Sequence, residues 1–158
     1  MLFSTKAEYG VRLMVELGRR TDGASPDEST PVSLTAVAEA ENLPLSYLEH
    51  LVAKLRQAGL VTSVRGAHGG YRLARDAADI AMLDVVQALE GPIAPMECFH
   101  TEREGRVLCS HEVDPDPCAT KLLWTRVHGG VTKALAGTTL AELVKFSEGQ
   151  TATPLTVA

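Results

Sequence analysis

The feature that most limits how this chain can fold is a change of hydrophobic period at Gly59. Before it, Leu48, Leu51 and Leu55 recur at helical spacing. After it, the β-prone runs 60–64 and 71–74 flank the segment 65–70, which contains three glycines. Glycine reaches positive φ at no steric cost, so this segment predicts the tip of a hairpin.

The segments before this point complete the pattern. Apolar residues at near-helical spacing predict an amphipathic first helix over residues 3–18, and residues 21–31 form a polar loop. Ser33 caps a short helix that ends around Asn42. The sequence Ser46-Tyr47-Leu48-Glu49 is interpreted as a capping box that begins the next helix: the serine oxygen accepts from the N–H of Glu49, whose carboxylate reaches back. Two short helices, a tight turn and a hairpin are the outline of a winged helix-turn-helix.

Further helices are expected in the second half of the chain. Asp79 is expected to open a helix that faces Ile80, Leu83, Val86 and Leu89 inward and ends at Gly91-Pro92. After Asp116-Pro117, a long helix carries Leu123, Trp124, Val127, Val131 and Leu135. Gly129-Gly130 interrupts its pattern, which indicates either a kink or close packing against a second helix. A capping box, Thr139 to Glu142, begins a short last helix.

The predicted fold is therefore mostly α with a small β-wing: a winged helix-turn-helix plus a long C-terminal helix. The expected divisions are a winged helix-turn-helix domain at 1–78, a connecting helix at 79–92, a cysteine loop at 93–118, C-terminal helices at 119–147 and a tail at 148–158.

Charge is distributed unevenly along the chain. The net charge of −5 at pH 7 does not by itself favour nucleic acid, yet no acidic residue lies between Glu49 and Asp76. That window contains Lys54, Arg56, Arg65, Arg72 and Arg75, together with His50 and His68. Basic side chains concentrated on the second helix of the turn motif and on the wing predict a DNA-binding face, because phosphate contacts supply much of such affinity.

The N-terminal residues of the recognition helix are expected to read base edges: Ser46, Tyr47, Glu49 and His50. Glu49 is a possible acceptor for a cytosine amino group, although its alternative role is only to close the capping box. Arg65 at the glycine-rich tip suits a minor groove, and the alternative is an ordinary solvated loop charge.

The cysteines are Cys98, Cys109 and Cys118. The chain has no run of 18 apolar residues and no secretory signal at its start, so it is expected to be cytoplasmic and not in a membrane. Thiols stay reduced in that compartment, so these cysteines are read as metal ligands, a redox site or inert packing rather than as disulfides.

The chain resembles the IscR/NsrR/CymR family of bacterial repressors, of the Rrf-two type. The segments that carry the resemblance are 4–10, 45–51, 59–66 followed by Gly69-Gly70-Tyr71, 89–93 and 138–143. The resemblance implies a homodimer built largely on the long helix after Cys118, so that the helices at 119–147 are dimerisation helices. It also implies that this dimer reads a two-fold symmetric operator. The predicted DNA-binding residues are Lys6, Tyr9, Ser46, Tyr47, Glu49, His50, Lys54, Arg65, Gly66, His68, Gly69, Tyr71 and Arg72.

Members of this family differ in the loop that corresponds to residues 93–118 of this chain. Repressors of the CymR kind lack the three cysteines and associate with an enzyme of cysteine synthesis, whereas members like IscR and NsrR carry three cysteines and bind an iron–sulfur cluster. The helical segments of this chain look more like the CymR kind, and the loop looks like the cluster-binding kind.

The predicted cluster ligands are Cys98, Cys109 and Cys118, at wider spacing than is usual for those members. Lys121 stands where some of them place a histidine, and an ammonium group cannot bind iron. Glu8 stands where some members take a carboxylate ligand from the first helix of the other subunit, so the resemblance makes it the favoured fourth ligand; the alternative reading of Glu8 is an exposed helix charge. His100 and His111, each in a Cys-x-His pair, are the alternatives, and they also keep zinc possible. Reversible thiol oxidation without metal is a further alternative.

These observations predict a dimeric repressor that senses iron–sulfur, redox or nitrosative status through a 2Fe-2S or 4Fe-4S cluster. The alternatives are a zinc-binding regulator, or a repressor of cysteine and sulfur metabolism controlled by a partner protein such as a cysteine-biosynthesis or cluster-assembly enzyme. An enzyme is not expected, because the sequence has no nucleophile–base signature and no phosphate-binding loop.

Overall fold

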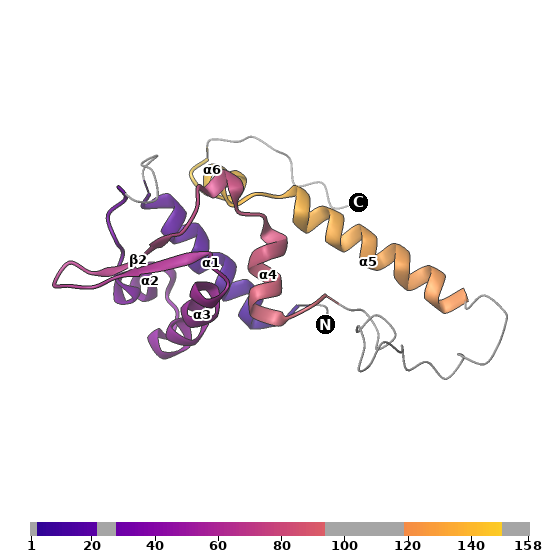
Figure 1. Ribbon diagram of the computed structural model, residues 1–158, viewed down its shortest axis with the longest axis horizontal. Helices are drawn as coiled ribbons and strands as arrows, with labels where there is room; N and C mark the ends of the chain where they lie inside the picture. Colours follow the sequence, from indigo (N-terminus) through magenta and orange to yellow (C-terminus); the bar gives the residue numbers. More distant parts are fainter. Residues whose placement is uncertain (1–2, 22–27, 94–118, 150–158) are drawn as a thin grey trace.

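The computed structural model describes residues 3–21, 28–93 and 119–149. Helices and a short hairpin make up this part of the chain (Figure 1). Their bounds are α1 Thr5–Arg19, α2 Leu34–Glu41, α3 Leu45–Gln57, β1 Val61–Val64, β2 Gly70–Leu73, the 3-10 turn η1 Ala77–Asp79, α4 Met82–Glu90, α5 Ala119–Gly137 and α6 Leu140–Ser147. The predicted class, mostly α with a small β-wing, is confirmed. No described helix is long and apolar enough to cross a membrane.

One hydrophobic core joins most of these elements. Its fully buried side chains include Leu13 and Met14 of α1, Leu48 and Leu55 of α3, and Leu140 of α6. Removing such a leucine from water stabilises the fold by roughly 1.5–3 kcal/mol. The last helix therefore belongs to the same core as the first, although more than a hundred residues separate them.

The wing is a two-stranded antiparallel sheet in which Val61 pairs with Leu73 and Val64 pairs with Gly70. Val32 extends it by an isolated bridge to Tyr71, with both backbone hydrogen bonds at 2.8 Å. At the tip, the Gly69 N–H donates to the Gly66 carbonyl at 3.0 Å, and Gly66 has a φ of 124°. The predicted hairpin is confirmed, and the positive φ explains a glycine at position 66.

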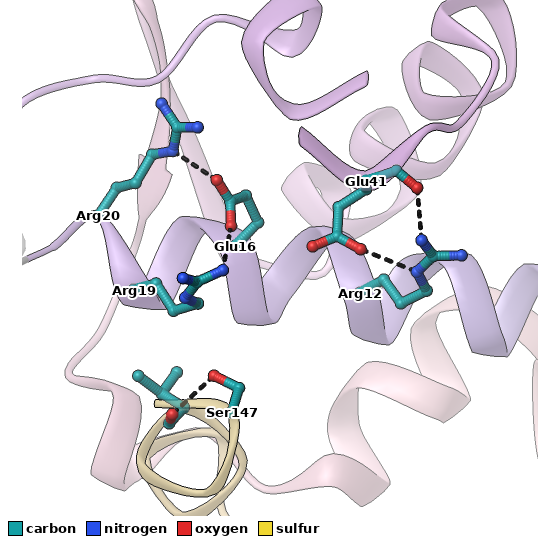
Figure 2. Close-up of polar contacts among 7 residues, drawn as sticks. Arg12, Glu16, Arg19, Arg20, Glu41 and Ser147 are labelled. Carbon is teal, nitrogen blue, oxygen red and sulfur yellow. Dashed lines mark hydrogen bonds and ion pairs between the residues drawn. The ribbon is translucent and has the colours of Figure 1, made fainter. Parts of the chain in front are cut away.

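Helix α2 begins and ends as the polar sequence predicts. The Ser33 hydroxyl accepts from the Ala36 N–H, and Asn42 ends α2 in the left-handed conformation with a φ of 51°. Figure 2 shows how α1 holds the end of α2: Arg12 donates from Nε to the Glu41 carboxylate at 2.9 Å and from a second nitrogen to the Glu41 carbonyl.

The capping box predicted at Ser46 to Glu49 is wrong. Helix α3 begins at Leu45, its N-cap is Pro44, and no side chain caps it. The Leu48 N–H already donates to the Pro44 carbonyl at 3.1 Å, so Ser46 lies inside the first turn. Proline suits this place because its fixed φ is close to the helical value and it has no N–H to satisfy.

The predicted start of the next helix at Asp79 is also wrong. Residues 77–79 form η1, and α4 begins only at Met82. The chain between them is extended because Ala81 pairs with Thr139, and the Leu140 N–H donates to the Ile80 carbonyl at 2.9 Å. The buried face is consequently Met82, Val85, Val86 and Leu89, while the predicted Leu83 is half-buried.

Helix α5 differs from the others, because none of its 19 residues is buried. It extends away from the core as one straight helix and continues through Gly129-Gly130 without interruption (Figure 1). Its C-terminal end joins the core, where Leu135 packs against the buried cluster. Helix α6 then packs on α1, so that a Cβ at Gly18 would lie 2.7 Å from the Val144 Cγ2.

Candidate nucleic-acid interface

Helix α3 presents one apolar and one polar face. Leu48, Leu51, Val52 and Leu55 are buried on the first face. Of the predicted base-reading residues, Ser46, Glu49 and His50 are exposed on the second. Glu49 makes no hydrogen bond to the described part of the chain, so its carboxylate is not used as a helix cap. The side chains that a recognition helix needs at its N-terminal end are therefore accessible.

Tyr9 and Tyr47 lie between α1 and α3. Both are half-buried, and their rings meet edge to face with centroids 5.7 Å apart and an interplanar angle of 88°. The Arg12 guanidinium lies over the Tyr9 ring, 5.9 Å from its centroid. An edge-to-face ring pair of this kind stabilises the fold by about 0.5–1.5 kcal/mol beyond the burial of the two rings. These tyrosines hold α3 against α1, a role that the sequence pattern did not indicate.

The tip of the wing is open to solvent. Arg65, Gly66 and His68 are exposed, and the hairpin projects away from the helices (Figure 1). Farther down the hairpin, Tyr71 and Arg72 are half-buried, and Tyr71 packs against the core. The hairpin therefore carries exposed basic groups at its tip and is anchored to the core at its base.

The segment without acidic residues, 50–75, is called the acid-free window below. Two of its basic residues contact α4 rather than lying free on the surface of α3 or the wing. The Lys54 ammonium donates to the Leu89 carbonyl at 3.0 Å, and Arg75 lies 3.7 Å from the Asp84 carboxylate. Arg56, which belongs to the same window, is exposed on α3. Arg56 is not among the predicted DNA-binding residues, although its position in the acid-free window could have indicated it.

The first turn of α1 brings Lys6 and Glu8 to the surface, where both are exposed. The Glu90 carboxylate of α4 accepts from the Ser4 N–H at 3.0 Å and also from the Ser4 hydroxyl. The hydroxyl bond, assisted by the backbone N–H groups of Ser4 and Ala7 and by the charge of Lys6, outweighs desolvation and lowers the pKa of Glu90. Sequence reasoning missed this residue, because its partner is 86 positions away.

The predicted metal ligands are mostly outside the described residues. Cys98, Cys109 and Cys118 lie there, as do His100 and His111. Glu8 is described and exposed, and Lys121 is exposed in the first turn of α5. Among the residues that the structure describes, no three histidine, cysteine or acidic side chains come together as a metal site.

An exposed recognition helix followed by a wing with exposed basic groups defines a DNA-binding regulator of the winged helix-turn-helix class. Residues 3–146 match the Rrf2 family model, which describes an iron-dependent transcriptional regulator. The chain belongs to this family.

Individual relatives support the same family assignment. The regulator CymR of Bacillus subtilis is 37% identical over 150 residues, which cover 95% of this chain and 94% of the relative. Its solved structure, titled the global cysteine regulator, superposes with a TM-score of 0.72 over 92% of this chain and 98% of that one. IscR of Vibrio atlanticus is 36% identical over 94% of this chain and 78% of its own. The structure of T. potens IscR gives 36% identity and a TM-score of 0.72 over 97% of this chain and 93% of that one. These proteins are named as transcriptional regulators, not as enzymes.

Proposed function

We propose that this regulator is a dimeric repressor of a two-fold symmetric operator, with α3 in the major groove and the wing tip at a minor groove. The observation that carries the proposal is the surface formed by α3 and the wing. Ser46, Glu49 and His50 are exposed on α3, Arg65 and His68 are exposed on the wing, and no acidic residue occurs from 50 to 75. Such a surface can approach phosphates closely while polar side chains reach base edges.

The dimer is proposed from α5. Leu122 and Leu123 are 59% and 57% exposed on a helix without buried residues. A Cβ at Gly129 or Gly130 would meet nothing within 4 Å in the described part of a single chain. A glycine inside a helix lowers the stability of the helix by about 1 kcal/mol relative to alanine. A second α5 that crosses closely at this point would need small residues there and so explains both glycines.

The experiment for the DNA interface is Arg65→Met, measured by operator binding across a salt series. Loss of one phosphate contact lowers affinity and reduces the slope of log affinity against log salt by about 1. Lys145→Met is the matched control, since Lys145 is exposed on α6, outside α3 and the wing. An unchanged slope for Arg65→Met would exclude a phosphate contact by the wing tip.

We propose further that Cys98, Cys109 and Cys118, with Glu8 of the partner subunit, hold an iron–sulfur cluster that controls DNA binding. Three thiolates and a carboxylate form a donor set that suits such a cluster. The iron-dependent description of the family and the similarity to IscR support this reading. Glu8 lies on α1 between the predicted DNA contacts Lys6 and Tyr9, so a ligand bound there acts close to the DNA-binding half. A colourless protein loaded with zinc would favour the alternative metal instead.

The test of the cluster is an anaerobic preparation analysed for iron, sulfide and visible absorption that disappears on acidification. Glu8→Ala is compared with His100→Ala and His111→Ala in the same assay. Loss of iron in the first variant alone assigns the fourth ligand to Glu8, whereas loss in a histidine variant assigns it to the loop. Equal operator affinity with and without iron would remove the sensing role and leave the repressor.

A second candidate function follows from the similarity to CymR, at 37% identity. In this proposal the chain represses genes of cysteine or sulfur metabolism and is controlled by a partner protein, such as an enzyme of cysteine synthesis. Replacing all three cysteines by serine distinguishes the two functions: regulation of the operator persists under partner control and is lost under cluster control.

A further inference from the structure

The C-terminal turn of α4 contacts both helices that carry the proposed DNA contacts. The Leu89 carbonyl accepts from the Lys54 ammonium of α3 at 3.0 Å, and Glu90 accepts from Ser4, the N-cap of α1. The Leu89 side chain is 1% exposed and occupies the place that a Cβ on Gly10 would need. Two consecutive residues of α4 thus connect it to α1 and to α3.

Helix electrostatics favours both polar contacts. The last carbonyls of a helix have no partner within it, and the negative end of its dipole attracts a cation such as Lys54. The first N–H groups of α1 form the positive end of its dipole, where the Glu90 carboxylate lies. Glu90, like any ordinary glutamate, is charged at neutral pH, and the hydrogen bond from Ser4 favours the charged form further by lowering its pKa. Each contact therefore pairs a charge with a helix end of opposite sign.

We propose that Glu90 and Lys54 are positioning residues of the DNA-binding surface. Glu90 holds the first turn of α1, which presents Lys6, and Lys54 holds α3, which presents Glu49 and His50. Hydrogen bonds to base edges and phosphates depend strongly on distance and angle, so release of either helix from α4 weakens binding. Lys54 then acts through α4 rather than as the phosphate contact that its sequence position suggests. This inference rests on the proposed function.

The first test is Glu90→Ala in the full-length chain. Removing a negative charge from a DNA-binding protein raises its affinity if only electrostatics is involved. The positioning role instead predicts operator binding that is weaker by about three- to tenfold, which corresponds to the net contribution of one typical intramolecular hydrogen bond. Glu90→Gln keeps an acceptor oxygen for Ser4 and is expected to recover part of the affinity. Glu39→Gln, an exposed carboxylate on α2, is the matched control and is expected not to weaken binding.

The second test is Lys54→Met, which keeps the aliphatic chain and removes the ammonium. Positioning predicts weaker operator binding with an unchanged salt slope. A phosphate contact predicts a slope reduced by about 1, as in Arg65→Met, and that result would overturn the role of Lys54. Operator affinity of Glu90→Ala equal to or tighter than that of the native chain would overturn the role of Glu90.

The outcomes separate this inference from the proposed function. If the native chain binds its operator and the variants behave as simple charge removals, only the positioning roles are excluded. If the native chain binds no operator DNA at all, the proposed function and this inference both fail. Thermal unfolding of each variant, followed in the same preparations, verifies that the chain remains folded.

Discussion

At the scale of single residues, the wing depends on a position at the tip end of β2 that cannot carry a side chain. A Cβ at Gly70 would collide with the carbonyl of Val32, the residue that bridges Tyr71 with two hydrogen bonds of 2.8 Å. Gly69 is restricted in the same way by the Val64 carbonyl. Neither Gly69 nor Gly70 is among the described glycines with a positive φ. Glycine is therefore required at these positions because there is no room for a Cβ, and not because of the backbone conformation.

We therefore expect Gly70→Ala to separate the wing from the segment before α2. The free energy of unfolding should fall by about 1–3 kcal/mol, the usual cost of forcing a methyl group into packed structure. Chemical denaturation measures this change. Gly137→Ala, at a described position where a Cβ meets nothing within 4 Å, is the control and should not destabilise the chain. Equal stability of the two variants would contradict the close approach of Val32.

At the scale of elements, the helix-turn-helix is held in place by α1. Arg12 binds both the carboxylate and the carbonyl of Glu41 at the end of α2 (Figure 2). It also lies over the ring of Tyr9, which contacts Tyr47 of α3. One guanidinium thus acts on both helices of the motif.

Arg12→Met is expected to lower the free energy of unfolding by about 1–2 kcal/mol, because the Arg12 side chain is 39% exposed and its bonds are partly screened by solvent. A double-mutant cycle with Glu41→Gln isolates the contact, and we expect the two changes to be non-additive by at least about 0.5 kcal/mol. Additive changes would show that the ion pair contributes nothing of its own.

At the scale of the whole molecule, the proposed dimer accounts for the exposed part of α5. Leu122 and Leu123 face solvent in a single chain, on the part of the helix that extends away from the core (Figure 1). An apolar helix face of this kind is typical of a protein–protein interface.

The variant Leu122→Lys with Leu123→Lys is expected to shift the protein from dimer to monomer and to reduce operator affinity, because two half-sites are then bound independently. Sedimentation measures the first effect and operator binding the second. Phe146→Lys, which changes an exposed apolar residue on α6, is the matched control and should remain dimeric. A dimeric double-lysine variant would exclude this end of α5 from the interface.

Local patterns predicted the existence of the helices and the glycine-tipped hairpin correctly. Two helix starts were wrong. Residues 80–82 pair with the distant segment 138–140, which delays α4 to Met82. The error at α3 was local, because Pro44 rather than Ser46 is its N-cap. The predicted role of each site residue in DNA or metal binding remains a prediction.

The acid-free window, residues 50–75, shows which properties follow from the sequence and which follow from the tertiary structure. The sequence alone determined that basic residues gather on one helix and one hairpin, because charge and hydrophobic period are local properties. Only the tertiary structure decided that Lys54 caps α4, that Arg75 approaches Asp84, and that Arg56 and Arg65 are left exposed. A side chain's partner depends on which helix ends the core brings together, and those ends come from residues far apart in the chain.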